Sequence, residues 1–288
     1  MARIFVTGSS DGLGRMAAQL LVGQGHTVVL HARDPARGRD AMAAVPGAET
    51  VLCADLASLR QTRGLAEQAN ALGPFDAVIH NAAVGYREKR RIPTEDGLSH
   101  VFAVNTLAPY VLTALMHRPR RLVYVSSELH RRGDPSLRDL NWADRPWRGN
   151  QAYSDTKLHD VLLAFAAARL WPGVKSNAME PGWVPTKMSP RATGDLDAAH
   201  RTQVWLAVGG TDESAGESGA EVGSGGYYYH LRPRPPSGAA TDEARQDRLL
   251  DACASLTGIS MPCRTASAVP QTTRRHPDRL TPPPGSVN

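Results

Sequence analysis

The chain has 288 residues, and its 33 Lys and Arg against 28 Asp and Glu give a formal net charge of +5. With 41% hydrophobic and 21% charged residues, it is neither a disordered chain nor too polar to bury a large core. No apolar run approaches the roughly 18 residues of a membrane span, and the N-terminus does not resemble a secretory signal. Three scattered cysteines without metal-ligand spacing predict free thiols, no metal site and a reducing, cytoplasmic location.

Short apolar runs alternate with longer amphipathic segments along most of the chain. Several apolar runs are continuous, as in strands that are covered on both faces. The expected strands are residues 3–7, 26–33, 49–54, 75–82, 121–127, 174–180 and 226–230. The expected helices are residues 14–22, 37–44, 58–72, 94–116, 151–171 and 241–256. This alternation predicts a single α/β domain of the Rossmann type, a doubly wound parallel sheet of about seven strands with helices on both faces.

Three segments interrupt the alternation. Residues 129–150 form a long polar stretch, and residues 209–226 are rich in Gly, Ser and Glu, which is typical of a flexible loop. Residues 259–288 are rich in Pro and Arg, so we expect a disordered tail after a folded domain of residues 1–258. The tail holds four basic residues and one acidic residue, more than half of the net charge. The sequence has no continuous basic stripe and no nucleic-acid recognition motif, so we expect no nucleic-acid partner.

The first strand runs into a glycine-rich turn, TGSSDGLG at residues 7–14, which opens the first helix. Glycines allow a tight turn here and let the backbone approach a pyrophosphate at the positive end of the helix. The turn alone could be an ordinary loop, but its place after the first strand of a βαβ unit favours a dinucleotide site. The expected contacts are Gly8, Ser10, Gly12, Leu13 and Gly14.

The second strand ends in Arg33, and Arg37 lies one helical turn further on. An acidic residue at this position binds both ribose hydroxyls, whereas an arginine accommodates a 2′-phosphate. The two arginines therefore favour NADP over NAD. The neighbouring Asp34 argues in the other direction, and two solvated arginines remain the alternative interpretation.

Tyr153 and Lys157 stand four residues apart on a predicted helix, so their side chains share one face. A phenol with a pKa near ~10 is a poor proton donor or acceptor at neutral pH, and a neighbouring ammonium group draws that pKa toward the working range. Such pairs also occur by chance on many helices. The strand that ends in Ser127 and the strand that ends in Asn81 reach the same sheet edge, which favours an active site.

The predicted helix 94–116 carries Asn105, and Pro109 follows it by four residues. Proline lacks the N–H that would bond the carbonyl of Asn105, and its ring crowds that carbonyl. We therefore expect a kink that frees this acceptor to hold a water molecule.

Together these motifs resemble the short-chain dehydrogenase/reductase family. They come in the family's order: TGSSDGLG, Asp55-Leu56, NAA at 81–83, Asn105, VSS at 125–127, YSDTK at 153–157 and PGWVPT at 181–186. The resemblance covers about residues 3–232. The long gap between Ser127 and Tyr153 is similar to the retinol dehydrogenase and protochlorophyllide reductase branch, and the segment after the second strand is similar to NADP-dependent carbonyl reductases. NAA in place of the usual NAG is a mild departure.

The resemblance implies an NADP(H)-dependent oxidoreductase that interconverts an alcohol and its carbonyl compound, a small-molecule substrate, by hydride transfer. Tyr153 would be the general acid/base and Ser127 would polarise the carbonyl. Lys157 would lower the pKa of Tyr153 and hold the nicotinamide ribose, and Asn105 would position a water through its carbonyl. The other implied cofactor contacts are Asp55, Leu56, Asn81, Ala82, Pro181, Gly182 and Thr186. Residues 129–150 and 183–226 would be substrate loops.

Some alternatives stay open at this point. A dinucleotide-binding redox sensor on the same fold is the non-catalytic alternative, although a sensor needs no acid. Trp142, Trp147 and Trp183 either line a substrate cleft or pack the 129–150 insertion onto the domain. His130 could be a second acid/base, but a surface-loop histidine is the favoured interpretation. The apolar stripe after Lys157 predicts either core contact or a homodimer interface; it consists of Leu162, Leu163, Phe165 and Leu170.

Overall fold

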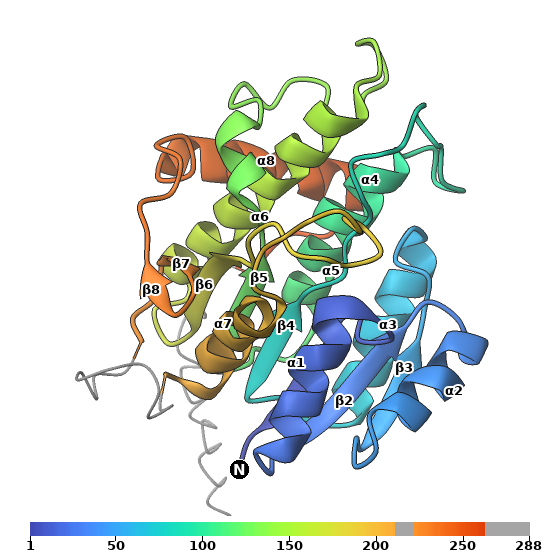
Figure 1. Cartoon of the computed structure of the whole chain (residues 1–288). Coiled ribbons are helices and arrows are strands. Elements are labelled where there is room, and N and C mark those ends of the chain that lie inside the picture. The colour runs from blue at the N-terminus through green and yellow to red at the C-terminus, as the bar shows by residue number, and fades with distance from the viewer. Residues whose placement is uncertain (211–221, 263–288) are drawn as a thin grey trace, which may run out of the picture.

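The computed structural model describes residues 1–210 and 222–262, which form one α/β domain around a single sheet (Figure 1). The eight strands lie in the order β3-β2-β1-β4-β5-β6-β7-β8, and β8 alone is antiparallel to its neighbour. The strands are β1 (Arg3–Val6), β2 (Thr27–Ala32), β3 (Thr50–Cys53), β4 (Ala77–His80), β5 (Arg121–Val125), β6 (Lys175–Glu180), β7 (Tyr227–Tyr229) and β8 (Arg232–Pro233). The predicted parallel sheet is confirmed, and β8 is an extra edge strand that the sequence did not indicate.

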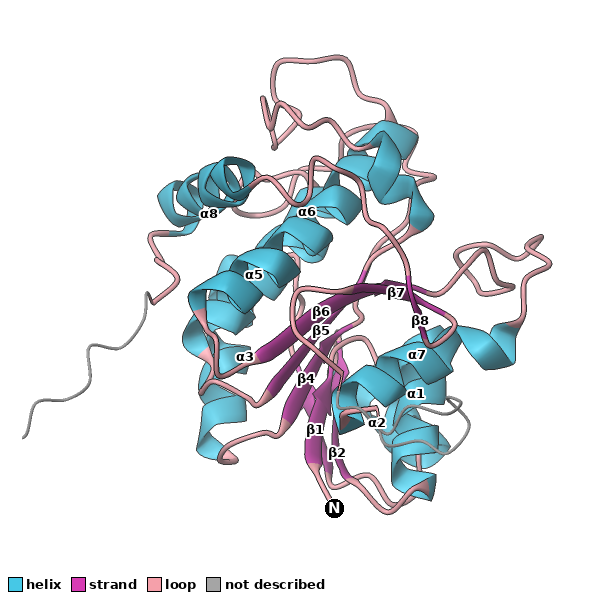
Figure 2. Ribbon diagram, turned by 90° about the vertical axis from the view of Figure 1, so that its left-hand side faces the viewer, coloured by secondary structure: helices cyan, strands magenta, loops and turns pink. Residues whose placement is uncertain are grey.

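Helices cover both faces of the sheet, with α1, α2 and α7 on one side and α3, α5, α6 and α8 on the other (Figure 2). A hydrophobic core lies on each face of the sheet, and successive side chains of β1 point into alternate cores. Phe5 packs into the core on the α3/α5/α6 side, whereas Ile4 and Val6 pack into the core on the α1/α7 side. This two-sided burial explains the continuous apolar runs in the sequence. The helices are α1 (Gly12–Gly23), α2 (Pro35–Ala44), α3 (Leu59–Ala71), α4 (His100–Phe102), α5 (Ala108–Leu115), α6 (Gly149–Leu170), α7 (Leu196–Val208) and α8 (Glu243–Thr257).

The predicted helix 94–116 is wrong in its first part and interrupted in its middle. Pro93 and Ser99 form an isolated bridge, and α4 begins only at His100. A π-helical turn, Ala103–Leu107, then separates α4 from α5. Pro109 has no N–H with which to continue the regular hydrogen bonding, so the irregularity lies where the sequence predicted a kink.

The predicted substrate loop 183–226 contains a helix, which corrects that prediction. Asp195 caps the start of α7 through a hydrogen bond from the Ala198 N–H to its side chain. Helix α7 packs beside α1, and its buried Val204 and Leu206 belong to the core on that face. Within the segment that the sequence predicts as a flexible loop, residues 211–221 lie outside the described residues.

The folded domain extends beyond residue 258, so the predicted start of the tail is also wrong. Ile259 and Met261 are buried. The Tyr110 hydroxyl donates to the carbonyl of Ile259 at 2.6 Å, and the Trp171 indole N–H donates to the carbonyl of Pro262 at 2.8 Å. The remainder of the predicted tail, residues 263–288, lies outside the described residues.

Helix α6 runs through the middle of the α-helical layer and is enclosed by its own chain. Every residue from Ala152 to Ala167 is buried, and α8 packs along the helix. Core contact therefore accounts for the buried Leu162, Leu163 and Phe165 of the apolar stripe, and the partly buried Leu170 packs against the same core. Among the residues that the structure describes, no helix combines the length and apolarity that crossing a membrane requires.

Candidate active site

A cavity of about 1150 Å³ opens at the carboxyl ends of the parallel strands. The strand order reverses between β1 and β4, and a crevice at such a switch point is where open α/β sheets bind ligands. The turn after β1, the segment after β4 and the segment after β5 all line this cavity, as do the start of α6 and the loop after β6. Every candidate site residue of the sequence lines it except Asn105.

The glycine-rich turn after β1 has the backbone that its glycines allow. Gly8 and Gly12 have positive φ angles of 65° and 52°, which other residues rarely adopt. A Cβ on Gly14 would lie 2.4 Å from Asn81 Nδ2 and 2.5 Å from the carbonyl oxygen of Gly8. The turn therefore folds back onto α1, with Asp11 capping the helix by accepting from the Gly12 N–H.

The half-buried Asn81 and the buried His31 hold this turn in place. The Asn81 amide donates to the carbonyls of Thr7 at 3.0 Å and Gly8 at 3.3 Å. The Gly8 N–H donates to His31 Nδ1 at 2.9 Å, which makes Nε2 the protonated nitrogen that donates to the Ala54 carbonyl at 3.0 Å. Burial lowers the pKa of His31 to about 4, so the imidazole is neutral and keeps this acceptor at physiological pH.

The end of β2 presents two arginines to the cavity. Arg33 and Arg37 both line it and are exposed. Asp34, between them, is the N-cap of α2 and accepts from the Arg37 N–H at 2.9 Å. Its carboxylate lies 3.9 Å from the Nε atoms of both arginines. Asp34, the acidic side chain that would favour NAD, therefore already caps α2 and pairs with both arginines.

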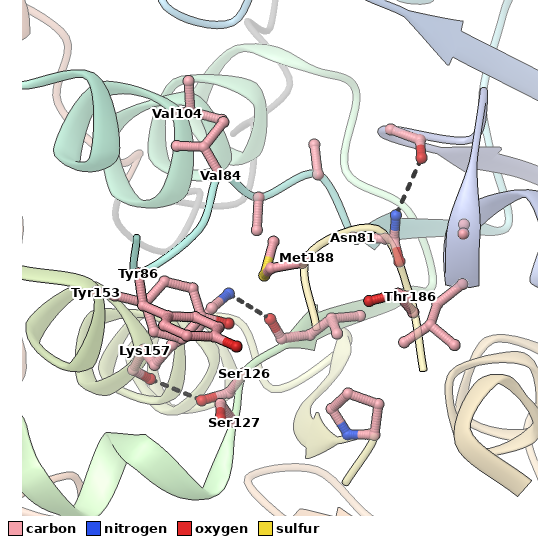
Figure 3. A pocket seen from close by; sticks show the side chains of 18 of the residues that line it. Asn81, Val84, Tyr86, Val104, Ser126, Ser127, Tyr153, Lys157, Thr186 and Met188 are labelled. Carbon is pink, nitrogen blue, oxygen red and sulfur yellow. Dashed lines mark hydrogen bonds between the residues drawn. The ribbon is translucent and has the colours of Figure 1, made fainter. Parts of the chain in front are cut away.

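The predicted Ser, Tyr and Lys come together at the other end of the cavity (Figure 3). Lys157 Nζ donates to the Val125 carbonyl at 2.8 Å and lies 5.5 Å from the centre of the Tyr153 ring. The Ser126 hydroxyl donates to the Lys157 carbonyl at 2.7 Å, which ties β5 to α6. Ser127 accepts from the Leu129 N–H at 3.2 Å, which leaves its own hydroxyl hydrogen for another acceptor.

The electrostatic balance at Tyr153 differs from the sequence-based expectation. Burial raises the pKa of its phenol above the usual value, and the positive charge of Lys157 opposes this only in part. The sequence predicted the effect of Lys157 but could not show that the phenol is 7% exposed. Desolvation disfavours the phenolate more than one nearby ammonium group favours it.

Asn105 lies in the π-helical turn behind the cavity wall. Its side-chain oxygen accepts from the Val84 N–H at 2.8 Å, and its amide donates to the Val84 carbonyl and to the Thr156 hydroxyl, both at 3.1 Å. It therefore joins the segment after β4 to the first turns of α6, which carry Tyr153. Because the Asn105 side chain bonds both the N–H and the carbonyl of Val84, it fixes the position of the cavity wall to which Val84 belongs.

His130, predicted to be a surface-loop histidine, is fully buried, and this corrects the prediction. Its Nδ1 donates to the Ser127 carbonyl at 2.8 Å, and its Nε2 accepts from the Ser237 N–H at 3.0 Å. It lies in a short 3₁₀ helix, Glu128–Arg132, whose N-cap is Ser127. His130 therefore connects the serine of the site to the chain that follows β8.

The three tryptophans divide between the two alternatives. Trp142 and Trp147 pack against each other at 5.5 Å, and Trp142 is buried, so they stabilise the insertion. Trp183 is 60% exposed and lines the cavity. Tyr86, for which the sequence carries no motif, also lines the cavity. Its ring lies edge-on to Tyr153, with the ring centres 5.7 Å apart, and its hydroxyl shares a 2.8 Å hydrogen bond with Ser189.

These residues fit a dinucleotide and show no alternative metal site. A Cβ on Gly8 would lie 2.8 Å from the Ala82 Cα, and a Cβ on Gly14 would lie 2.5 Å from the Gly8 carbonyl oxygen, so the turn requires glycine at both positions. The cavity runs from this turn past Arg33 to Tyr153. In residues 1–210 and 222–262, no three His, Cys, Asp or Glu side chains gather in a way that could hold a metal ion.

Comparisons with known proteins agree with this fold. A family model described as short chain dehydrogenase matches residues 2–133. An uncharacterized oxidoreductase of Emericella nidulans is 46% identical over 266 residues, 91% of this chain and 99% of the relative. Human retinol dehydrogenase 13 is 30% identical over 299 residues, 93% of this chain and 88% of the relative.

A crystal structure of an uncharacterized protein from Mycobacterium paratuberculosis has a TM-score of 0.76 at 26% identity, over 91% of this chain and 95% of that chain. The fold therefore matches a solved structure over nearly its whole length. The predicted resemblance is confirmed: the chain belongs to the short-chain dehydrogenase family and is an oxidoreductase with a nucleotide-binding Rossmann fold.

Proposed function

We propose that this oxidoreductase uses NADP(H) to interconvert a carbonyl compound and its alcohol, with Tyr153 as the general acid/base. The observation that carries the proposal is a single cavity that contains the glycine turn and two arginines at one end and Ser127, Tyr153 and Lys157 at the other. A non-catalytic sensor would need only the first end of this cavity.

The residues of this chain fit NADP at the first end. The turn from Gly8 to Gly14 would take the pyrophosphate at the N-terminus of α1. Arg33 and Arg37 would pair with a 2′-phosphate, since they are exposed, line the cavity and flank an aspartate that already caps α2. Asp55 and Leu56 would contact the adenine, beside the segment Asn81-Ala82. The nicotinamide carboxamide would meet Pro181, Gly182 and Thr186, which line the cavity after β6.

When bound, the reduced nicotinamide supplies the hydride. The chain's own side chains handle the oxygen of the substrate. Ser127 would donate a hydrogen bond to the carbonyl oxygen and so stabilise the charge that develops there. Tyr153 would give this oxygen its proton, and its raised pKa keeps the phenol protonated and ready to donate at neutral pH. Lys157 would hold the ribose and steady the phenolate that results.

Asn105 acts from outside the cavity in this proposal. Its side chain fixes Val84 and Thr156, and its carbonyl, which Pro109 cannot bond, would hold the water that connects Lys157 to solvent. Tyr86, Trp183 and Met188 provide an aromatic and apolar wall next to Tyr153. This wall favours a carbonyl compound with a planar apolar body over a small polar one.

Turnover by the wild-type protein tests the proposal against the sensor. A panel of aryl ketones, aliphatic ketones and aldehydes is incubated with NADPH and, separately, with NADH, while the loss of reduced nicotinamide absorbance is followed. We expect turnover with NADPH, faster than with NADH, and highest for aryl ketones. Tight NADPH binding without turnover of any compound, and without oxidation of the corresponding alcohols by NADP⁺, would favour the sensor.

A further inference from the structure

Asp160 is a buried carboxylate that has no role in the proposed function. It lies three residues after Lys157 on α6, and its Oδ2 is 2.8 Å from Lys157 Nζ. The two side chains are only 4% and 3% exposed. A buried ion pair costs both groups their hydration and is often no more stable than apolar side chains of the same size. Packing alone therefore does not explain a carboxylate at this position.

The pair determines where the remaining donor of Lys157 points. An ammonium group has three N–H donors. One goes to Asp160 and one to the Val125 carbonyl, both at 2.8 Å. One donor is left for the cavity, which Lys157 lines together with Tyr153 (Figure 3). The Val125 carbonyl and the Asp160 carboxylate thus fix the ammonium group in place through two of its three donors.

We propose that Asp160 is a positioning residue of the active site: its carboxylate keeps the Lys157 ammonium group charged and oriented beside the Tyr153 phenol. The proposal rests on the proposed function, because it concerns the same proton donor. It adds a fourth side chain to the Ser, Tyr and Lys set, one that acts only through Lys157.

The surroundings of Asp160 leave Lys157 as its charged partner. The titratable groups that interact with the carboxylate are Lys157 and Tyr153 on α6 and Tyr124 on β5. The Tyr124 hydroxyl shares a 2.7 Å hydrogen bond with the Thr113 hydroxyl, and burial raises the pKa of Tyr124 above its usual value, so the phenol stays neutral. Burial raises the pKa of Asp160 to about 6, so the ion pair is complete above neutral pH.

Removing this carboxylate has a predictable direction. Burial alone lowers the pKa of a lysine, by up to about 3–5 units when the group has no partner. In this protein desolvation is the largest single influence on the pKa of Lys157, but the pKa is still raised, because the charge of Asp160, the hydrogen bond to Asp160 and the neighbouring Tyr153 phenol together outweigh it. In Asp160→Asn, which keeps the shape and one acceptor, Lys157 would lose its proton before Tyr153 ionises. The phenol would then have no cation beside it.

The first test follows the ionisation of Tyr153 itself. The ultraviolet absorbance of phenolate is titrated in the wild type and in Asp160→Asn, and the curve of Tyr153→Phe in each background is subtracted. The variant also removes the charge of Asp160, which itself raises the pKa of Tyr153, but the effect of the Lys157 cation is the larger of the two. Loss of this cation, 5.5 Å from the centre of the ring, should therefore move the Tyr153 titration up by about one pH unit. A titration at the wild-type pH, or below it, would overturn the proposal.

A matched control separates this role from a structural one. Asp155 is a second buried carboxylate of α6, paired with Arg145 at 2.6 Å, and it does not line the cavity. Asp155→Asn should lower stability but leave the Tyr153 titration unchanged, and equal shifts in both variants would contradict our proposal. If Asp160→Asn does not fold, Asp160→Ser carries the same expectations, because it leaves room for a water that can bond Lys157.

The second test uses turnover. Alcohol oxidation needs the phenolate, so Asp160→Asn should slow it about tenfold at pH 8 and move the acidic limb of its pH profile upward by about the same interval as the titration. An unchanged profile would count against the role of Asp160. The absorbance titration requires no substrate, so a wild type without turnover would refute the proposed function while the titration still decides on Asp160.

Discussion

Replacing Gly14 by alanine tests the geometry of the glycine turn most severely. Gly14 lies in the first turn of α1, and its missing Cβ is where the turn and the segment after β4 meet. A methyl group there would lie 2.4 Å from Asn81 Nδ2, 2.5 Å from the Gly8 carbonyl oxygen and 3.0 Å from the Gly8 carbonyl carbon. Two of these neighbours are backbone atoms, which cannot rotate away.

The magnitude follows from these contacts. To make room, Asn81 must give up its bonds to Thr7 and Gly8, at about 1 kcal/mol each. Moving the Gly8 backbone adds the cost of overpacking, about 1–3 kcal/mol. Alanine regains about 1 kcal/mol through its better helix propensity. We therefore expect Gly14→Ala to lower the free energy of unfolding by about 2–4 kcal/mol, and to weaken NADPH binding at least about tenfold.

The assay pairs urea unfolding with NADPH titration. Gly64 is a matched control, since it lies inside α3 and a Cβ on it would meet nothing within 4 Å. Gly64→Ala should raise the free energy of unfolding by about 0.5–1 kcal/mol and leave NADPH binding unchanged. A Gly14→Ala protein that unfolds at the wild-type urea concentration and binds NADPH normally would refute this account of the turn.

Three further predictions concern the cofactor end and the serine. Arg33→Ala with Arg37→Ala should cut the preference for NADPH over NADH at least about tenfold; an unchanged ratio of kcat/KM values would make the arginines merely solvated. The pKa of His31 is about 4 in the fold against 6.5 in its usual state, so between these pH values only the unfolded chain takes up its proton. His31 therefore contributes about 3 kcal/mol of stability above pH 6.5 that is lost as the pH falls toward 4. His31→Gln should flatten the stability curve in that window, and an equal slope would contradict the neutral imidazole. His130→Phe should lower kcat more than NADPH affinity, because it releases the Ser127 carbonyl and not the glycine turn; parallel losses would indicate a general loss of structure.

The parts of the site that the sequence predicted depend on local spacing and on the parallel sheet. The glycine turn needs only its own residues, and Tyr153 and Lys157 share a helix face. The edge that unites them with Ser127 follows from the carboxyl ends of parallel strands. None of these inferences requires knowledge of which side chains pack together, so they could be made from the chain alone.

The parts that it missed depend on packing between distant segments. His130 was expected in solvent because its partner Ser237 lies 107 residues away. Asp160 stands at a visible spacing from Lys157, but only burial makes the pair significant. Helix α7 had a signal in the Asp195 cap and the apolar residues that follow, but the Gly- and Pro-rich residues around it favoured a loop.

The role of Tyr153 is the central claim, and Tyr153→Phe tests it most directly. The variant removes one hydroxyl and keeps the ring that packs against Tyr86. Single-turnover hydride transfer from NADPH is measured together with the NADPH dissociation constant, on the carbonyl compound that the wild type reduces fastest. We predict a loss of about 10³-fold or more in the rate, with NADPH binding within about threefold of the wild type. A variant that transfers hydride at the wild-type rate would show that the proton comes from another group.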